Sequence, residues 1–125
     1  MKPHEAWFIK AENDLKSAIK LIEGGNPILD TAVFHAQQCA EKALKAYLSY
    51  KSQPIQRTHD VELLVELCCS IEEDFKGLLN DAKNLTPYNT AFRYPDIFLE
   101  PDKEDVLDAI EKAKKILDYV KRKIP

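Results

Sequence analysis

Residues 29–50 read LDTAVFHAQQCAEKALKAYLSY. Small and apolar side chains recur in this stretch at spacings of three and four, which is the period of one face of an α-helix. The alanines on this face allow a neighbouring helix to approach closely. The stretch therefore predicts a long helix from about Leu29 to Tyr50. Its packed face consists of Val33, Ala36, Ala40, Ala43 and Tyr47.

Polar residues occupy the other side of this predicted helix. Gln38, Lys42 and Lys45 lie there, away from the packed face. Glu41 and Lys45 are spaced i,i+4 in the favourable order, a pair worth about 0.3 kcal/mol on a helix surface.

Three other segments have the same helical periodicity. They run from about Glu5 to Glu23, from about Val61 to Leu85, and from Asp102, a candidate N-cap, into the C-terminal region. Ser70-Ile71-Glu72-Glu73 matches a capping box and predicts a new helix or a bend there. Thr86-Pro87 predicts an N-cap and a short helical turn near residues 88–91. We expect an all-α, up-and-down four-helix bundle with an extra short helix, forming one domain over residues 1–125.

The composition excludes several classes of protein. The chain has 125 residues, a formal net charge of -3 and a pI near 5.6, so any contact with nucleic acid must be local. Cys39, Cys68 and Cys69 match neither a disulfide framework nor a zinc site, and we expect buried, reduced thiols. Neither a stretch of about 20 apolar residues nor a signal peptide is present. We therefore expect a cytoplasmic protein without a metal or cofactor.

The loop Arg93-Tyr94-Pro95-Asp96 is not explained by helix packing. An arginine fork suits phosphate, and a tyrosine ring stacks on bases. Two roles of Arg93 remain open: it binds phosphate, or it ties the loop to a half-buried carboxylate such as Asp14 in the first helix. Tyr94 is either a packing residue or a stacking platform.

A second candidate is His59, in Arg57-Thr58-His59-Asp60 at the start of the predicted third helix. A histidine beside a carboxylate can act as a general base or can donate a hydrogen bond to phosphate. Alternatively, it only completes a helix N-terminus. Thr58 or Asp60 can be the N-cap, and Asp60 can also orient the imidazole.

Taken together and in order, these elements resemble the HEPN domain (higher eukaryote and prokaryote nucleotide-binding). The resemblance runs from about Glu5 to Val120. It rests on a Gln-Gln-x-x-Glu-Lys-x-x-Lys helix at residues 37–45, followed by Thr58-His59-Asp60-Val61, Arg93-Tyr94-Pro95-Asp96 and a terminal helix with Ala109-Ile110 and Ala113. In the first helix, Ala11, Asp14, Leu15 and Ala18 also fit.

The resemblance implies a four- or five-helix bundle and a homodimer. Many small prokaryotic members are encoded beside a minimal nucleotidyltransferase, in pairs that look like toxin–antitoxin or two-part nucleotidyltransferase systems. Some members are metal-independent ribonucleases with an Arg-x(4–6)-His motif. This sequence lacks that motif, because none of Arg57, Arg93 and Arg122 is followed by a histidine at that spacing. We therefore expect a binding subunit that is not catalytic alone.

In this interpretation Arg93 holds a phosphate or an acidic group of the partner, and His59 forms a hydrogen bond nearby. Tyr94 packs or stacks. Lys42 and Lys45 add positive potential to a shared cleft, and Asp14 and Asp60 give structural support. The ligand would be a nucleotide or RNA.

Two alternatives stay open. A dimer could assemble a metal-independent ribonuclease site from Arg93 and His59 in spite of the unusual spacing. Alternatively, the protein is a purely structural interaction module in which Arg93 is locked to Asp14. The sequence does not distinguish a toxin from an antitoxin.

Overall fold

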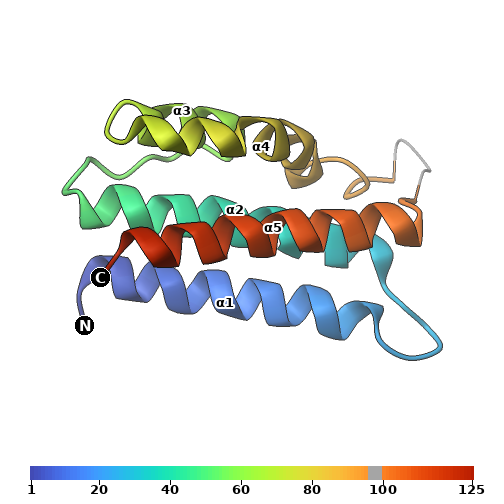
Figure 1. Ribbon diagram of the computed structural model, residues 1–125. Helices are drawn as coiled ribbons and strands as arrows, with labels where there is room; N and C mark the ends of the chain where they lie inside the picture. The colour runs from blue at the N-terminus through green and yellow to red at the C-terminus, as the bar shows by residue number, and fades with distance from the viewer. Residues whose placement is uncertain (96–99) are drawn as a thin grey trace.

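The structure, a computed structural model, describes residues 1–95 and 100–125, and these residues are helical without any strand (Figure 1). The α-helices of the described part are α1 (Pro3–Ile22), α2 (Leu29–Tyr50), α3 (Val61–Cys69), α4 (Leu79–Leu85) and α5 (Lys103–Lys123). Two 3-10 helices, η1 (Glu73–Leu78) and η2 (Thr86–Asn89), lie before and after α4. The predicted all-α bundle is confirmed.

Helix α2 is the centre of the bundle. It contacts α1 on one side, α5 on another, and α3, α4 and η2 on a third (Figure 1). Fourteen of its 22 residues are buried, more than a helix packed on one face can bury. The fully buried alanines at 36, 40 and 43 leave room for this close packing.

The predicted third helix is not continuous. It is divided into α3 and the η1–α4 segment, which lie against each other. The break near Ser70 was expected, but Ser70 was predicted to cap the start of the new helix. Ser70 instead ends α3, and its hydroxyl donates to the carbonyl of Leu67 at 2.7 Å. The new helix begins at Glu73 as a 3-10 helix.

The predicted N-caps differ in the bonds that their side chains make. The hydroxyl of Thr86 accepts the backbone N–H of Glu62 at 3.2 Å and donates to the carbonyl of Ala82, so it joins α3 to α4. Asp102 is the N-cap residue of α5 as expected, although its side chain makes no capping bond within the described residues. In contrast, Asp60 caps α3 as expected, because its carboxylate accepts the N–H of Leu63 at 3.1 Å.

The three cysteines are free thiols; Cys39 and Cys68 are buried and Cys69 is half-buried. Burial and the charge of Asp14 raise the pKa of Cys39 to about 12. None of the helices that the structure describes is both long and apolar enough to cross a membrane.

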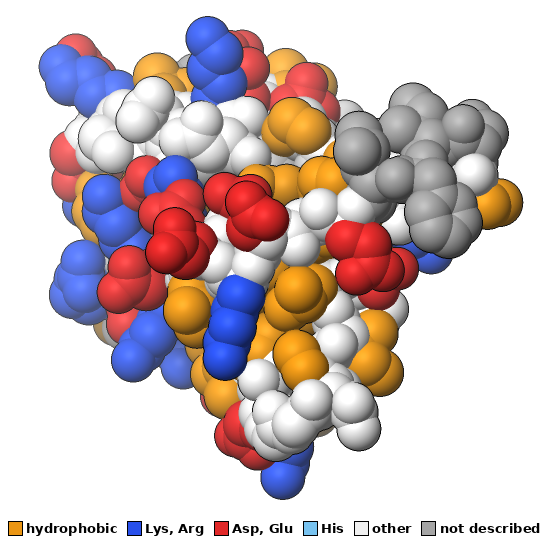
Figure 2. Space-filling model, turned by 90° about the vertical axis from the view of Figure 1, so that its right-hand side faces the viewer, with side chains coloured by type: hydrophobic (Ala, Val, Ile, Leu, Met, Phe, Trp, Pro, Cys, Tyr) orange, Lys and Arg blue, Asp and Glu red, His pale blue; other side chains and the backbone are white. Residues whose placement is uncertain are grey.

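One end of the bundle, where α2 and α5 begin, has exposed hydrophobic side chains between acidic and basic ones (Figure 2). Ile28 precedes α2 and Leu107 lies in the second turn of α5, and both are exposed. The two termini lie together at the opposite end (Figure 1).

At the terminal end, Glu72 joins α2 to α5. The hydroxyl of Tyr47 donates to its carboxylate, and Lys123 Nζ lies 3.1 Å from it and also pairs with Asp74. The hydrogen bond from Tyr47 and the one from Lys123 lower the pKa of Glu72. The ionised carboxylate is therefore the form that the folded state prefers.

We expect Glu72→Gln to lower the free energy of unfolding more at about pH 7 than at about pH 3. The pKa of Glu72 is lower in the folded state, so its contribution is present above the ordinary glutamate pKa of about 4.3. This contribution is lost as the pH falls through the folded-state pKa. Urea denaturation at both pH values measures the difference, with Glu66→Gln on the exposed face of α3 as control. An equal loss at both pH values would contradict the assignment.

Candidate functional site

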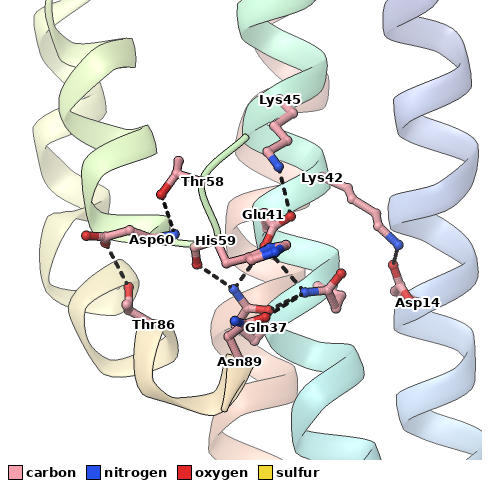
Figure 3. Close-up of polar contacts among 11 residues, drawn as sticks. Asp14, Gln37, Glu41, Lys42, Lys45, Thr58, His59, Asp60, Thr86 and Asn89 are labelled. Atoms are coloured by element: carbon pink, nitrogen blue, oxygen red, sulfur yellow. Dashed lines mark hydrogen bonds and ion pairs between the residues drawn. The ribbon is translucent and has the colours of Figure 1, made fainter. Parts of the chain in front are cut away.

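The carboxylate of Glu41 is the best-enclosed charge of the described residues, with only 3% of its side chain exposed. It lies where α2 meets the segment before α3 (Figure 3). Lys45 Nζ lies 3.0 Å from one oxygen, and His59 Nδ1 lies 2.9 Å from the other. The amides of Gln37 and Gln38 are each 3.3 Å from the same oxygen as His59. These donors replace the water that burial removes.

The same amides connect Glu41 to two other segments. Gln37 donates to the backbone carbonyl of His59 at 2.9 Å. Gln38 Nε2 lies 2.7 Å from the side-chain oxygen of Gln37, Oε1. It also lies 3.3 Å from the side-chain oxygen of Asn89, Oδ1, in η2 (Figure 3). The network therefore holds the segment before α3 and the η2 turn against α2.

His59 has a defined orientation and an accessible ring. Since a carboxylate only accepts, Nδ1 carries a proton, and Nε2 of the neutral ring is an acceptor. The side chain is 59% exposed, and Nε2 makes no hydrogen bond within the described residues. This is the arrangement that orients a general base. Asp60, which could have oriented this ring as well as capping α3, forms the capping bond, and Glu41 orients the ring.

Lys45 and Gln38 are buried, although the periodicity placed them on the side away from the packed face. Lys45 is 8% exposed, and its ammonium is neutralised by Glu41 and lies 5.6 Å from the centroid of the Trp7 ring. It lines a small hollow with Trp7, Ile55 and Gln56, among others. Lys45 therefore stabilises the buried carboxylate of Glu41.

Asp14 is the second buried carboxylate, 7% exposed. His35 Nδ1 lies 2.8 Å from one of its oxygens and Lys42 Nζ 2.6 Å from the other (Figure 3 draws the lysine pair). An Asp14–Arg93 pair, one of the two roles left open for Arg93, is therefore not formed, since both carboxylate oxygens bind groups of α2. Asp14 joins α1 to α2, and the structural module that depended on that pair loses its basis.

Arg93 is held by an aromatic ring. Its guanidinium carbon lies 3.9 Å from the centroid of the Phe34 ring, at the start of α2, while the residue itself is exposed. The preceding residue, Phe92, has a φ of 66°, an uncommon conformation for a bulky side chain. Its ring stacks on Tyr88. Tyr94 is 61% exposed, so it is not a core packing residue. Asp96 lies outside the described residues.

The structure places Arg93 and His59 along α2, but at different levels. Arg93 contacts Phe34 and His59 contacts Glu41, seven residues further, which corresponds to about 10 Å of helix. The hollow at Trp7 and Lys45 is lined by neither of them. They therefore form two polar positions on one surface, in place of the single cleft that we expected.

Sequence reasoning missed two functional groups, Glu41 as an acceptor of several donors and His35 as a partner of Asp14. The sequence did contain a signal for the role of Glu41. Gln37, Glu41 and Lys45 recur at i,i+4, and Gln38 is adjacent, so one stripe of an alanine-rich helix is polar. A polar stripe on a helix that is buried all round requires internal partners.

Comparison with known proteins agrees with this architecture. The model of the HEPN domain family matches residues 4–123. The chain belongs to the HEPN family. It is similar over its whole length to ST0689, described as an archaeal HEPN homologue, with 32% identity, a TM-score of 0.78 and complete coverage of both chains.

A second crystal structure similar to this HEPN protein is that of TT1696 from Thermus thermophilus. The identity is 28% and the TM-score 0.82, with 99% of this chain and 100% of that chain covered. No curated protein matches the chain.

We expect Glu41→Gln to lower the free energy of unfolding by about 3–5 kcal/mol, because it leaves the buried Lys45 ammonium without its counter-charge. Urea denaturation measures the change. Glu111→Gln, on the exposed face of α5, is the control and should stay within about 0.5 kcal/mol of the wild type. The double variant Glu41→Leu, Lys45→Met removes both charges and should recover most of the loss. A Glu41→Gln variant as stable as the control would show that the network contributes little.

Proposed function

We propose that this HEPN protein is the binding subunit of a two-part nucleotidyltransferase or toxin–antitoxin system in the cytoplasm, acting with a minimal nucleotidyltransferase. The observation that supports this most is the exposed guanidinium of Arg93, stacked on Phe34 beside the exposed Tyr94. Membership of the family supports it further, through the pairing that the resemblance implies.

Stacking on Phe34 restricts Arg93 before any ligand arrives. The contact with the ring is a cation–π contact, so the N–H groups of the guanidinium stay available for a carboxylate or a phosphate. Less side-chain entropy is then lost on binding. Arginine and tyrosine are also enriched among the residues that contribute most to protein interfaces. Arg93 and Tyr94 therefore suit an acidic or phosphate-bearing surface of a partner.

His59 supplies a second contact. It is oriented by Glu41 and lies about 10 Å further along α2 than the Arg93 contact. A protein partner with its bound nucleotide is large enough to reach both positions. Lys42 and Lys45 do not bind the partner directly in this proposal, because their charges are compensated by ion pairs with Asp14 and Glu41. They support binding by stabilising the carboxylates that orient the histidines.

We also propose a homodimer, as the resemblance to the family implies. The exposed hydrophobic side chains at the end where α2 and α5 begin support an interface there (Figure 2). Ile28 and Leu107 are the residues that we would test first.

The experiment for the binding function is a pull-down with the product of the neighbouring gene, which under this proposal is a minimal nucleotidyltransferase. We expect a complex at micromolar concentration, weakened at least about tenfold by Arg93→Ala, the scale of a residue that dominates an interface. Arg122→Ala is the matched control, because its guanidinium also lies over an aromatic ring, Tyr119, on α5. Absence of a complex with the wild type would overturn the proposal.

A ribonuclease is the second candidate, favoured by the orientation of His59 on Glu41. Two copies of the chain could bring Arg93 of one and His59 of the other to the same RNA. Under our first proposal, we expect no cleavage of mixed RNA in EDTA by the purified protein. Cleavage that persists in EDTA and disappears in both Arg93→Ala and His59→Ala, but not in His4→Ala, would establish the ribonuclease instead.

A further inference from the structure

A hollow between α1 and α2 is lined by cationic and neutral polar side chains and by the apolar Leu21. Asn13, Lys16, Ser17 and Lys20 come from α1, and Thr31 and His35 come from α2. The side chains lining this hollow include no acid, although the chain as a whole is acidic. The hollow is on the α1 side of α2, where Asp14 and Lys42 lie, and not at the Glu41 network.

The two lysines keep their charge available. Neither Lys16 nor Lys20 forms an ion pair within the described residues. The neighbouring Asp30 accepts the N–H and the hydroxyl of Thr31. The buried Asp14 behind His35 is compensated by Lys42. The charged side chains that line the hollow are therefore cationic, which favours an anion there.

His35 is fixed at the edge of the hollow. Its Nδ1 donates to the buried carboxylate of Asp14, so Nε2 is the ring nitrogen left for a ligand, and it donates to a phosphate oxygen when the ring is protonated. The ring also packs edge-on against Phe34, whose other contact is the guanidinium of Arg93. A buried carboxylate that orients an accessible imidazole beside two uncompensated lysines is a preformed arrangement for an anion.

We propose that this hollow is a phosphate-binding site. Lysines bind phosphate as point charges, and the hydroxyl of Ser17 and the amide of Asn13 can donate to its remaining oxygens. The stretch from residue 13 to residue 20 spans about 10 Å of helix, which suits one or two linked phosphate groups rather than a long nucleic acid. This site does not depend on the proposed partner, because none of its lining residues belongs to the Arg93 surface.

The test is an NMR titration of the full-length, ¹⁵N-labelled protein with inorganic pyrophosphate. We expect saturable shifts at Lys16, Ser17 and Lys20 and at the His35 ring. Lys16→Gln with Lys20→Gln should weaken binding at least tenfold. Lys83→Gln with Lys103→Gln is the control, since these exposed lysines of α4 and α5 carry the same charge and should leave the affinity unchanged. Absence of saturable shifts, or an equal loss in the control, would overturn the site.

Two further variants separate this site from the Glu41 network. His35→Gln should weaken pyrophosphate binding, while His59→Gln should leave it unchanged. Their amide spectra report whether each variant is folded. If His59→Gln weakens binding as much as His35→Gln does, pyrophosphate binds elsewhere and the proposal is wrong.

The source of the phosphate is tested with matched ligands. AMP should compete with pyrophosphate, and adenosine should not; equal competition by adenosine would exclude phosphate recognition. A short RNA with a 5′-phosphate should compete better than the same RNA with a 5′-hydroxyl. Equal competition by the two RNAs would keep phosphate chemistry but assign it to the backbone, contrary to the short site proposed here.

Discussion

Burial of the Glu41 carboxylate is the constraint on which the rest of the structure depends. An ionised carboxylate without water is very unfavourable unless donors replace its hydration. Four side chains from α2 and the segment before α3 lie within hydrogen-bond distance of it. Because one of them is His59, the chain after α2 must return to this level of the helix. The path of that segment and the start of α3 follow from this requirement.

Asp14 forms the same kind of buried carboxylate site as Glu41, on another side of α2. Each buried carboxylate binds the Nδ1 of a histidine and the Nζ of a lysine: Asp14 binds His35 and Lys42, and Glu41 binds His59 and Lys45. The lysine compensates the charge, and the histidine ring is oriented with its other nitrogen available. Polar groups that join the helices thus also present two imidazoles at the surface. Stability and binding chemistry therefore share residues in this bundle.

The sequence predicted the helices well because periodicity depends on local spacing, and the long helices are strongly amphipathic. It failed where the outcome depends on contacts between helices. A single packed face was assigned to α2, with Gln38 and Lys45 on the opposite side, whereas α2 is covered on several sides and both residues are buried. Asp14 was correctly expected to need a partner, but periodicity cannot choose between an arginine in a distant loop and two side chains on the adjacent helix. Similarly, the Ser70 motif marked the break but not which helix its hydroxyl would serve.

The placement of Arg93 shows why such an error matters for function. In an ion pair with Asp14, the charge of Arg93 would have been neutralised inside the protein, and the loop would have had only a structural role. The cation–π contact with Phe34 holds the guanidinium and leaves its N–H groups for a ligand. Phe34 also contacts His35, at the edge of the hollow with Lys16 and Lys20. One aromatic ring therefore separates a surface suited to a partner from a hollow suited to phosphate, and a ligand that occupies one lies next to the other.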